Sequence, residues 1–242
     1  MTDHFLLLNP TKTEIIVFGS KRLLSELEIG GVFLKPSVCI RLVNVTKNLG
    51  FTLDSSLTLN PQIKKLKAAN CHKMRNIAKM KPFLSEAQMQ IIVQSLVISS
   101  LDYCNALYFG TNHSVLKQLQ SLQNRACRLV KGLKRREEVE PYIKELHWLK
   151  VQERIEFKVL LLTFKVLHGL APPYLSNLVK YNSSGGRDVS LHCPMNTPPR
   201  AFSSSAPRLW NNLPQEITKC VNIKDFKGKL KAHLFRKSFD LY

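Results

Sequence analysis

Residues 60–84, NPQIKKLKAANCHKMRNIAKMKPFL, mark the point where the apolar pattern of the chain changes to a helical period. Apolar side chains recur there at spacings of three and four residues, which is typical of an amphipathic helix with one buried face. The stretch therefore predicts a helix over roughly 60–82 that packs against a core. The apolar stripe consists of Ile63, Leu66, Ala69, Met74, Ile77, Met80 and Leu84.

Upstream of this helix, short runs rich in Ile, Val and Phe are separated by Gly, Pro and Asn. Such runs predict strands joined by turns, and together they predict a small antiparallel β element. The runs are residues 13–19, 27–34, 38–43 and 49–54.

Downstream, helical patterns continue at roughly 86–108, 113–131 and 150–168. The last pattern includes RIEFKVLLLTFKVL, residues 154–167, which is apolar nearly all round, so we expect it to be the central buried helix. Residues 181–205 are rich in Ser, Gly and Pro without a period, which predicts a linker or surface loop.

Beyond this loop, RLWNNLPQEI, residues 208–217, predicts a short helix. Residues 222–239 predict a closing helix with Ile223, Phe226, Leu230 and Leu234 on one face. The expected fold class is α+β, with a small antiparallel β element before a mainly helical bundle and a loop-rich tail. The expected divisions are 1–55, 56–180, 181–205 and 206–242.

The chain is strongly basic, with a formal net charge of +19 from 36 Lys and Arg against 17 Asp and Glu. Residues 55–85 and 103–136 each contain seven Lys or Arg and no acid, and 218–237 contains seven against one Asp. Charges that only solvate a surface are usually mixed in sign, so these stretches favour a nucleic-acid partner. A solvated helix face and an anionic membrane surface are the alternatives. The candidate phosphate contacts are Lys64, Lys65, Lys67, Arg75, Lys79, Lys117, Arg128 and Lys131.

Patterns for enzymatic chemistry are weak in this sequence. The adjacent pairs Cys71-His72 and His192-Cys193 lack the spacing of zinc ligands, so no metal site is predicted. No Gly-x-Ser-x-Gly elbow or phosphate-binding Gly-Lys-Ser/Thr loop occurs, and the six Asp include no adjacent pair that could hold two metal ions. Six scattered Cys favour reduced thiols, and no apolar run is long enough to span a membrane. We therefore expect an intracellular protein of the nucleus or cytoplasm, without a membrane partner.

Six sequence blocks in the same order resemble reverse transcriptases of non-LTR retrotransposons of the Jockey-like type. The resemblance covers roughly residues 3–237, which correspond to the carboxy-terminal third of the family's reverse transcriptase. The blocks are FLLLNPTKTEIIVFGS (5–20), VTKNLGFTLDSSLTLNPQIKKL (45–66), VISSLDYCNALYFG (97–110), LQSLQNRACRLV (119–130), LHWLKVQERIEFKVLLLTFKVLHGLAPPYL (146–175) and RAFSSSAPRLWNNLPQEI (200–217).

The resemblance implies that residues 1–55 are the end of a polymerase palm and that the helices from 60 onward are thumb-like. In the family, an earlier Ala-Asp-Asp motif carries the catalytic aspartates, and the parent enzyme uses Mg. That motif lies upstream of the matched part, so no cofactor and no enzymatic activity are expected of this chain. Lys12 matches a lysine of the palm that is thought to protonate the leaving pyrophosphate. Without the catalytic aspartates, Lys12 is not expected to perform this role here.

Three functional hypotheses remain open at this point. The first is a truncated remnant of an RNA-directed DNA polymerase, which binds a primer-template duplex or RNA/DNA hybrid through its basic helices without catalysis. The second is the thumb end of an active reverse transcriptase whose gene model is incomplete. The third is a helical module co-opted to bind a protein partner.

Overall fold

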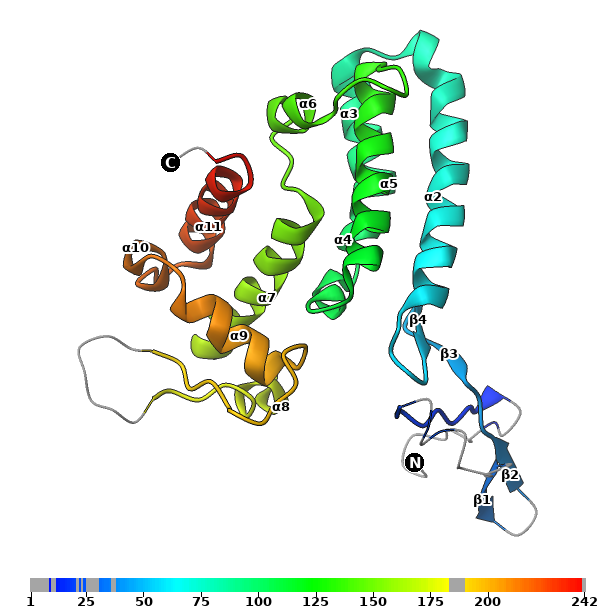
Figure 1. The fold of residues 1–242 in the computed structure, drawn as a ribbon, viewed down its shortest axis with the longest axis vertical. Helices are drawn as coiled ribbons and strands as arrows, with labels where there is room; N and C mark the ends of the chain where they lie inside the picture. Colours follow the sequence, from blue (N-terminus) through cyan, green and yellow to red (C-terminus); the bar gives the residue numbers. More distant parts are fainter. Residues whose placement is uncertain are drawn as a thin grey trace. The chain divides into compact units, whose positions relative to one another are not determined.

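The computed structural model describes residues 9, 12–20, 22, 24, 31–35, 38–182 and 190–240. The chain divides into two compact units, Met1–Lys67 and Ala68–Tyr242. Among the described residues, all of the strands belong to the first unit, and the second unit is mainly helical (Figure 1). The predicted α+β class, with a small antiparallel β element before a mainly helical region, is confirmed.

The β element of the first unit consists of two antiparallel hairpins. The turn of the second hairpin is formed by Leu49 and Gly50, whose φ angles of 46° and 88° give the left-handed backbone that a tight two-residue hairpin turn needs. The paired strands are β1 (Gly31–Lys35) with β2 (Val38–Arg41), and β3 (Val45–Asn48) with β4 (Phe51–Asp54).

The strand predicted at 13–19 is wrong. Ile15 makes a single parallel bridge to Leu42, and its carbonyl accepts a hydrogen bond from Val43 N–H at 2.8 Å. A β-branched run forms a strand only where a neighbouring edge supplies a ladder of partners, and β propensity says nothing about such an edge. Residues 27–30 of the next predicted run lie outside the described residues.

Helix α2 (Asn60–Met80) begins in the first unit, and Asp54 fixes its start. The buried Asp54 carboxylate accepts hydrogen bonds from the backbone N–H groups of Thr58 and Leu59 at 2.8 and 2.7 Å, and from the Thr58 hydroxyl at 2.9 Å. Gln62 Oε1 accepts from Thr52 N–H at 2.9 Å, which ties β4 to the first turn of the helix. Asp54 is therefore a structural residue of the strand-to-helix connection.

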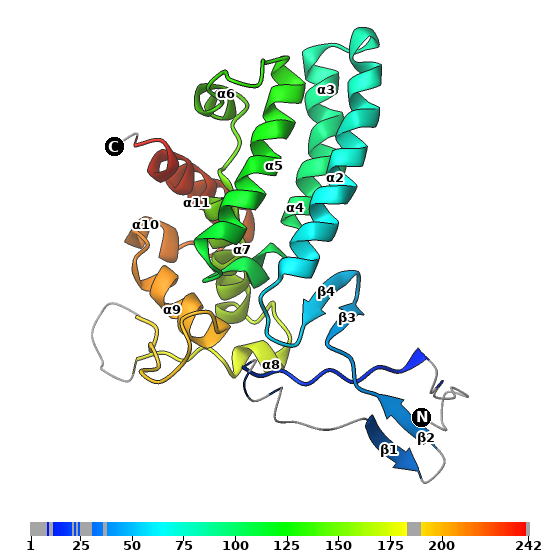
Figure 2. The ribbon, with the colours of Figure 1, turned by 45° about the vertical axis from the view of Figure 1, so that its right-hand side comes forward.

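In the second unit, the helix predicted at 86–108 is not continuous. A π-helical turn lies within it, and the chain leaves the helix at Tyr103 and Cys104, where Cys104 has a φ of 52°. Figure 2 shows α3 and α5 side by side in this part of the unit. The elements are η3 (Lys81–Phe83), α3 (Glu86–Val93), η4 (Gln94–Ile98), α4 (Ser99–Asp102), η5 (Asn105–Tyr108) and α5 (His113–Lys131).

Helix α7 (Val151–Leu167) is the centre of the second unit, as predicted. It packs against α5 on one side and against α9 and α11 on the other (Figure 1). Its buried residues Phe164 and Leu160 join Trp210 of α9 and Phe226 of α11 in one apolar core. The remaining elements are α6 (Glu140–Glu145), α8 (Pro173–Ser176), α9 (Phe202–Asn211), α10 (Gln215–Thr218) and α11 (Ile223–Ser238).

The predicted boundary between a linker at 181–205 and a segment at 206–242 does not separate two packing units. Leu191 is fully buried in the core, where Asn211 accepts from Leu191 N–H and donates to its carbonyl, both at 2.8 Å. Helix α9 already begins at Phe202, and its Ser204 and Ser205 are buried. Small residues let the helix approach the core closely, so a Ser-rich composition here reflects packing as well as loop structure.

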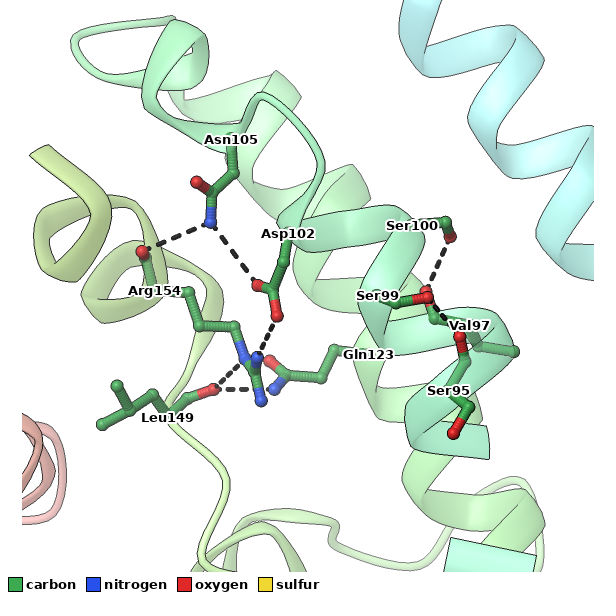
Figure 3. Close-up of polar contacts among 9 residues, drawn as sticks. All are labelled: Ser95, Val97, Ser99, Ser100, Asp102, Asn105, Gln123, Leu149 and Arg154. Atoms are coloured by element: carbon green, nitrogen blue, oxygen red, sulfur yellow. Dashed lines mark hydrogen bonds and ion pairs between the residues drawn. The ribbon is translucent and has the colours of Figure 1, made fainter. Parts of the chain in front are cut away.

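A polar network holds the start of α7 to α5 and to the turn after α4 (Figure 3). The Leu149 carbonyl accepts from Gln123 Nε2 at 2.7 Å and from Arg154 Nε at 2.9 Å. Arg154 Nη1 also pairs with Asp102 Oδ2 at 2.9 Å, and Asn105 Nδ2 donates to the Arg154 carbonyl at 3.3 Å. One carbonyl and one guanidinium thus join three segments that are distant in sequence.

We predict that Gln123→Leu lowers the free energy of unfolding by about 1–2 kcal/mol, because the fully buried amide of Gln123 loses its bond to the Leu149 carbonyl. Denaturant titration followed by circular dichroism measures this change. The matched control is Gln94→Leu on an exposed position, which should stay within about 0.5 kcal/mol of the wild type. Equal effects of the two substitutions would contradict the network.

Glu153 should make the folding stability of the protein depend on pH. Burial raises the pKa of this carboxyl more than the hydrogen bond from its own backbone N–H lowers it, and weaker effects of Glu156, which raises the pKa, and of Lys150 and Lys237, which lower it, follow. The folded state therefore holds the proton more tightly than the unfolded state, so this group's contribution to stability falls as the pH rises from the ordinary Glu pKa through the raised one.

Glu153→Gln should consequently stabilise the protein at pH 7 by about 1 kcal/mol, because the buried Oε2 has no hydrogen-bond partner among the described residues. The advantage should shrink as the pH is lowered toward 4. Thermal melts of both proteins across this pH range measure the difference. A variant that gains most at low pH would show the opposite sign and contradict the assignment.

Candidate nucleic-acid interface

Helix α5 presents a line of basic and polar residues on the side away from its core. Lys117, Ser121, Arg125 and Arg128 follow one another at spacings of four, four and three residues, which places them on one face at about 100° of rotation per residue. The opposite face is fully buried. Lys117 and Arg128, both predicted as phosphate contacts, therefore share one helix face. The buried side consists of Val115, Leu119, Leu122, Gln123, Ala126, Cys127 and Val130.

The cations predicted on α2 lie in both units. In the second unit Arg75 and Lys79 are one turn apart and exposed. In the first unit Lys64 and Lys65 are exposed, whereas Lys67 is half-buried and already has an interaction within the chain. Arg75 and Lys79 therefore lie in the same unit as the basic face of α5.

Lys131 does not point into solvent as the helical pattern suggested. Its side chain is only 7% exposed, and its Nζ lies 2.6 Å from Glu86 Oε1 and 2.5 Å from Glu145 Oε1. Hydrogen bonds to Glu145 and Glu86 raise the pKa of the ammonium. A phosphate would have to displace both carboxylates, so Lys131 links α3, α5 and α6 rather than extending the exposed basic face.

Several other acids of the second unit are also used inside the fold. Asp102 pairs with Arg154, as described above, Glu140 pairs with Lys150 at 2.6 Å, and Glu156 pairs with Lys237 at 2.9 Å. In contrast, five exposed cations of the two helices make no ion pair with any described residue. These five are Lys64, Lys65, Arg75, Lys79 and Lys117.

Three further cations gather with Arg128 at the end of α5, and none of them was among the predicted contacts. They are Lys81, Arg125 and Arg135, which line one open hollow together with Arg128. The spacing of eight residues from Lys117 could have identified Arg125. Lys81 and Arg135 lie in the acid-free stretches 55–85 and 103–136, but no helical spacing places them beside Arg128, because the fold brings them in from outside the helix.

Lys12 is exposed, and its backbone N–H donates to the Asn9 carbonyl at 3.2 Å. Its ammonium makes no ion pair with a described carboxylate. Over the part of the chain that the structure describes, no three His, Cys, Asp or Glu side chains come together to hold a metal ion. Within the same residues, no helix is long and apolar enough to cross a membrane.

Cys71, Cys104, Cys127, Cys193 and Cys220 are free thiols. Cys127 lies on the buried side of α5, where burial raises the pKa of its thiol to about 11 against the lowering effect of Lys131 and Arg128. A thiol with this pKa stays protonated at neutral pH and is a poor nucleophile and metal ligand.

We predict that Lys131→Met lowers the free energy of unfolding by about 1 kcal/mol, because Glu86 and Glu145 lose a shared partner while water screens both of them. Urea titration measures the loss. Lys117→Met is the matched control, since Lys117 is exposed on the same helix, and it should leave stability within about 0.5 kcal/mol. The assignment is contradicted if the control costs as much as the test variant.

Comparisons with known proteins leave the family of the chain open. No protein-family model, no curated protein and no solved structure matches it. The resemblance to non-LTR reverse transcriptases therefore stays an expectation from the sequence blocks. The function has to be argued from the residues themselves.

Proposed function

We propose that the chain binds the phosphate backbone of a nucleic-acid duplex, such as an RNA/DNA hybrid, through its basic helix faces. In the second unit these cations are Arg75 and Lys79 on α2 and Lys117 and Arg128 on α5. Lys64 and Lys65 at the start of α2 carry further cations of the same kind. Lys67 and Lys131, which the sequence also suggested, are engaged within the protein and are left out of the surface.

One observation carries this proposal: carboxylates pair with Lys131, Lys150, Arg154 and Lys237, while the exposed cations of α2 and α5 have no described carboxylate beside them. Uncompensated positive charge on rigid helices attracts polyanions and releases their condensed counterions. A backbone ligand fits because the helices offer cations that recur along their exposed faces.

The sequence resemblance suggests the origin of this role, as the thumb-like remnant of an RNA-directed DNA polymerase of the nucleus or cytoplasm. We assign the chain no catalytic step. Lys12 would need the aspartates and metal ions of the family's earlier motif to act as a leaving-group acid. If these are joined to it in a longer product, the thumb end of an active reverse transcriptase becomes the better description.

The salt dependence of binding tests the proposal. Arg75→Gln, Lys79→Gln and Lys117→Gln together should weaken binding to a labelled duplex. They should also reduce the slope of log K against log salt by roughly 2–3, at about 0.9 for each phosphate that the variant no longer neutralises. Fluorescence anisotropy of the full chain between 50 and 200 mM salt measures both values, in a range where binding to several phosphates weakens about 10³-fold or more.

The matched control is the triple variant Lys144→Gln, Lys180→Gln and Arg208→Gln, which removes the same charge from exposed positions outside the acid-free stretches. It should keep the wild-type slope. If both triple variants reduce the slope equally, net charge alone explains binding, and the proposed surface is wrong.

Two exposed apolar side chains favour a second candidate, a module that binds a protein. Phe83 at the turn after α2 is 86% exposed, and Ile91 on α3 is 65% exposed. A protein partner on such side chains should form a stoichiometric complex that survives high salt. Loss of the complex after nuclease treatment would rule out this alternative.

A further inference from the structure

An open hollow at the C-terminal end of α5 has a strongly positive lining. Its volume is about 800 Å³, and its cations come from three segments: Lys81 from η3, Arg125 and Arg128 from α5, and Arg135 from the turn that follows. Among the described residues, no carboxylate lines the hollow. A volume of this size is typical of sites for small organic ligands, which occupy about 300–1,000 Å³.

Gly132, which ends α5, lines the hollow. Gly132 closes the helix with a φ of 71°, and the Leu133 N–H donates to the Arg128 carbonyl at 3.1 Å, so the chain turns back toward the helix. A Cβ atom at Gly132 would lie only 2.6 Å from Lys81 Nζ. The Lys81 ammonium thus lies beside the last turn, where it offsets the partial negative charge of the helix end.

The four cations of the hollow have no carboxylate partner among the described residues. Arg125 Nη1 donates to Cys71 Sγ at 3.0 Å, and Arg128 Nη2 donates to the Glu137 carbonyl at 3.1 Å. Arg128 Nε is buried and makes no hydrogen bond with a described residue. Glu86 and Glu145 at this end of the bundle are held by Lys131 instead, while Arg128 also borders a neighbouring hollow that Glu138 and Glu140 line.

Like charges gathered in one hollow repel each other, and a polyanionic ligand relieves that repulsion. Guanidinium groups bind phosphate oxygens in a bidentate manner, and several of them around one cavity fit more than one phosphate. The Ser121 hydroxyl adds a neutral donor to the lining.

We infer that the hollow is a binding site for closely spaced phosphate groups, supplied either by the end of a nucleic-acid strand or by a free oligophosphate. It differs from the basic helix faces because it is a hollow whose cations come from three segments. With a strand as ligand, the inference deepens the proposed function and rests on it. With a free oligophosphate it stands independently.

Isothermal titration of the full chain with inorganic tripolyphosphate at constant ionic strength tests the inference. The wild type should bind this probe, and Arg125→Gln with Arg135→Gln should bind at least 10-fold more weakly. The matched control, Lys144→Gln with Lys180→Gln, removes the same charge outside the hollow and should bind like the wild type. If the double variant does not fold, Arg135→Gln alone, beyond the end of α5, replaces it with an expected weakening of at least 3-fold.

Competition identifies the source of the phosphates. A short single-stranded oligonucleotide that displaces tripolyphosphate supports a strand end, and an oligonucleotide that does not displace it supports a free oligophosphate. The inference is overturned if the wild type does not bind the probe, or if the hollow variants bind it as tightly as the control. The variant of Arg75, Lys79 and Lys117 leaves the hollow intact, so a failure of the proposed duplex surface is distinguishable from a failure of this site.

Discussion

Helix α7 constrains the whole helical unit, because its apolar side chains face nearly every direction and each side has to be covered. Val151, Ile155, Val159, Leu160 and Phe164 are all buried. Hydrophobic burial at about 25 cal/mol per Å² makes an uncovered side of such a helix costly. The amphipathic helices α5, α9 and α11 therefore surround it, and their polar sides become the surface.

This arrangement also determines where charge appears. At the start of α7, the Leu149 carbonyl is satisfied by Gln123 and Arg154, and the Arg154 guanidinium pairs with Asp102. At the C-terminal end of α5, Lys131 forms ion pairs with Glu86 and Glu145. With these carboxylates engaged in holding the helices together, Lys64, Lys65, Arg75, Lys79 and Lys117 are exposed and make no ion pair with a described residue. The basic surface is thus partly a consequence of how the core is assembled.

Much of the helical fold could be predicted because local signals agree with the final packing. The start of α3 follows the Ser85–Gln88 capping box, Asn112 caps α5, and Asn222 caps α11. The predicted core face of α11 is likewise buried at Phe226, Leu230 and Leu234. Less predictable were the break at Cys104 and the burial of Leu191, because both depend on neighbours distant in sequence.

The candidate nucleic-acid interface likewise has features that the sequence predicts and features that only the fold sets. The sequence by itself determined the helix faces, the exposure of Lys117 and Arg75, and the excess of positive charge, because these follow from helical period and composition. Only the tertiary structure decided that Lys131 is held between Glu86 and Glu145, and that Lys81, Arg125, Arg128 and Arg135 surround one hollow. The physical reason is that a charge acts over a few ångströms, and the groups within that distance are chosen by how the helices pack.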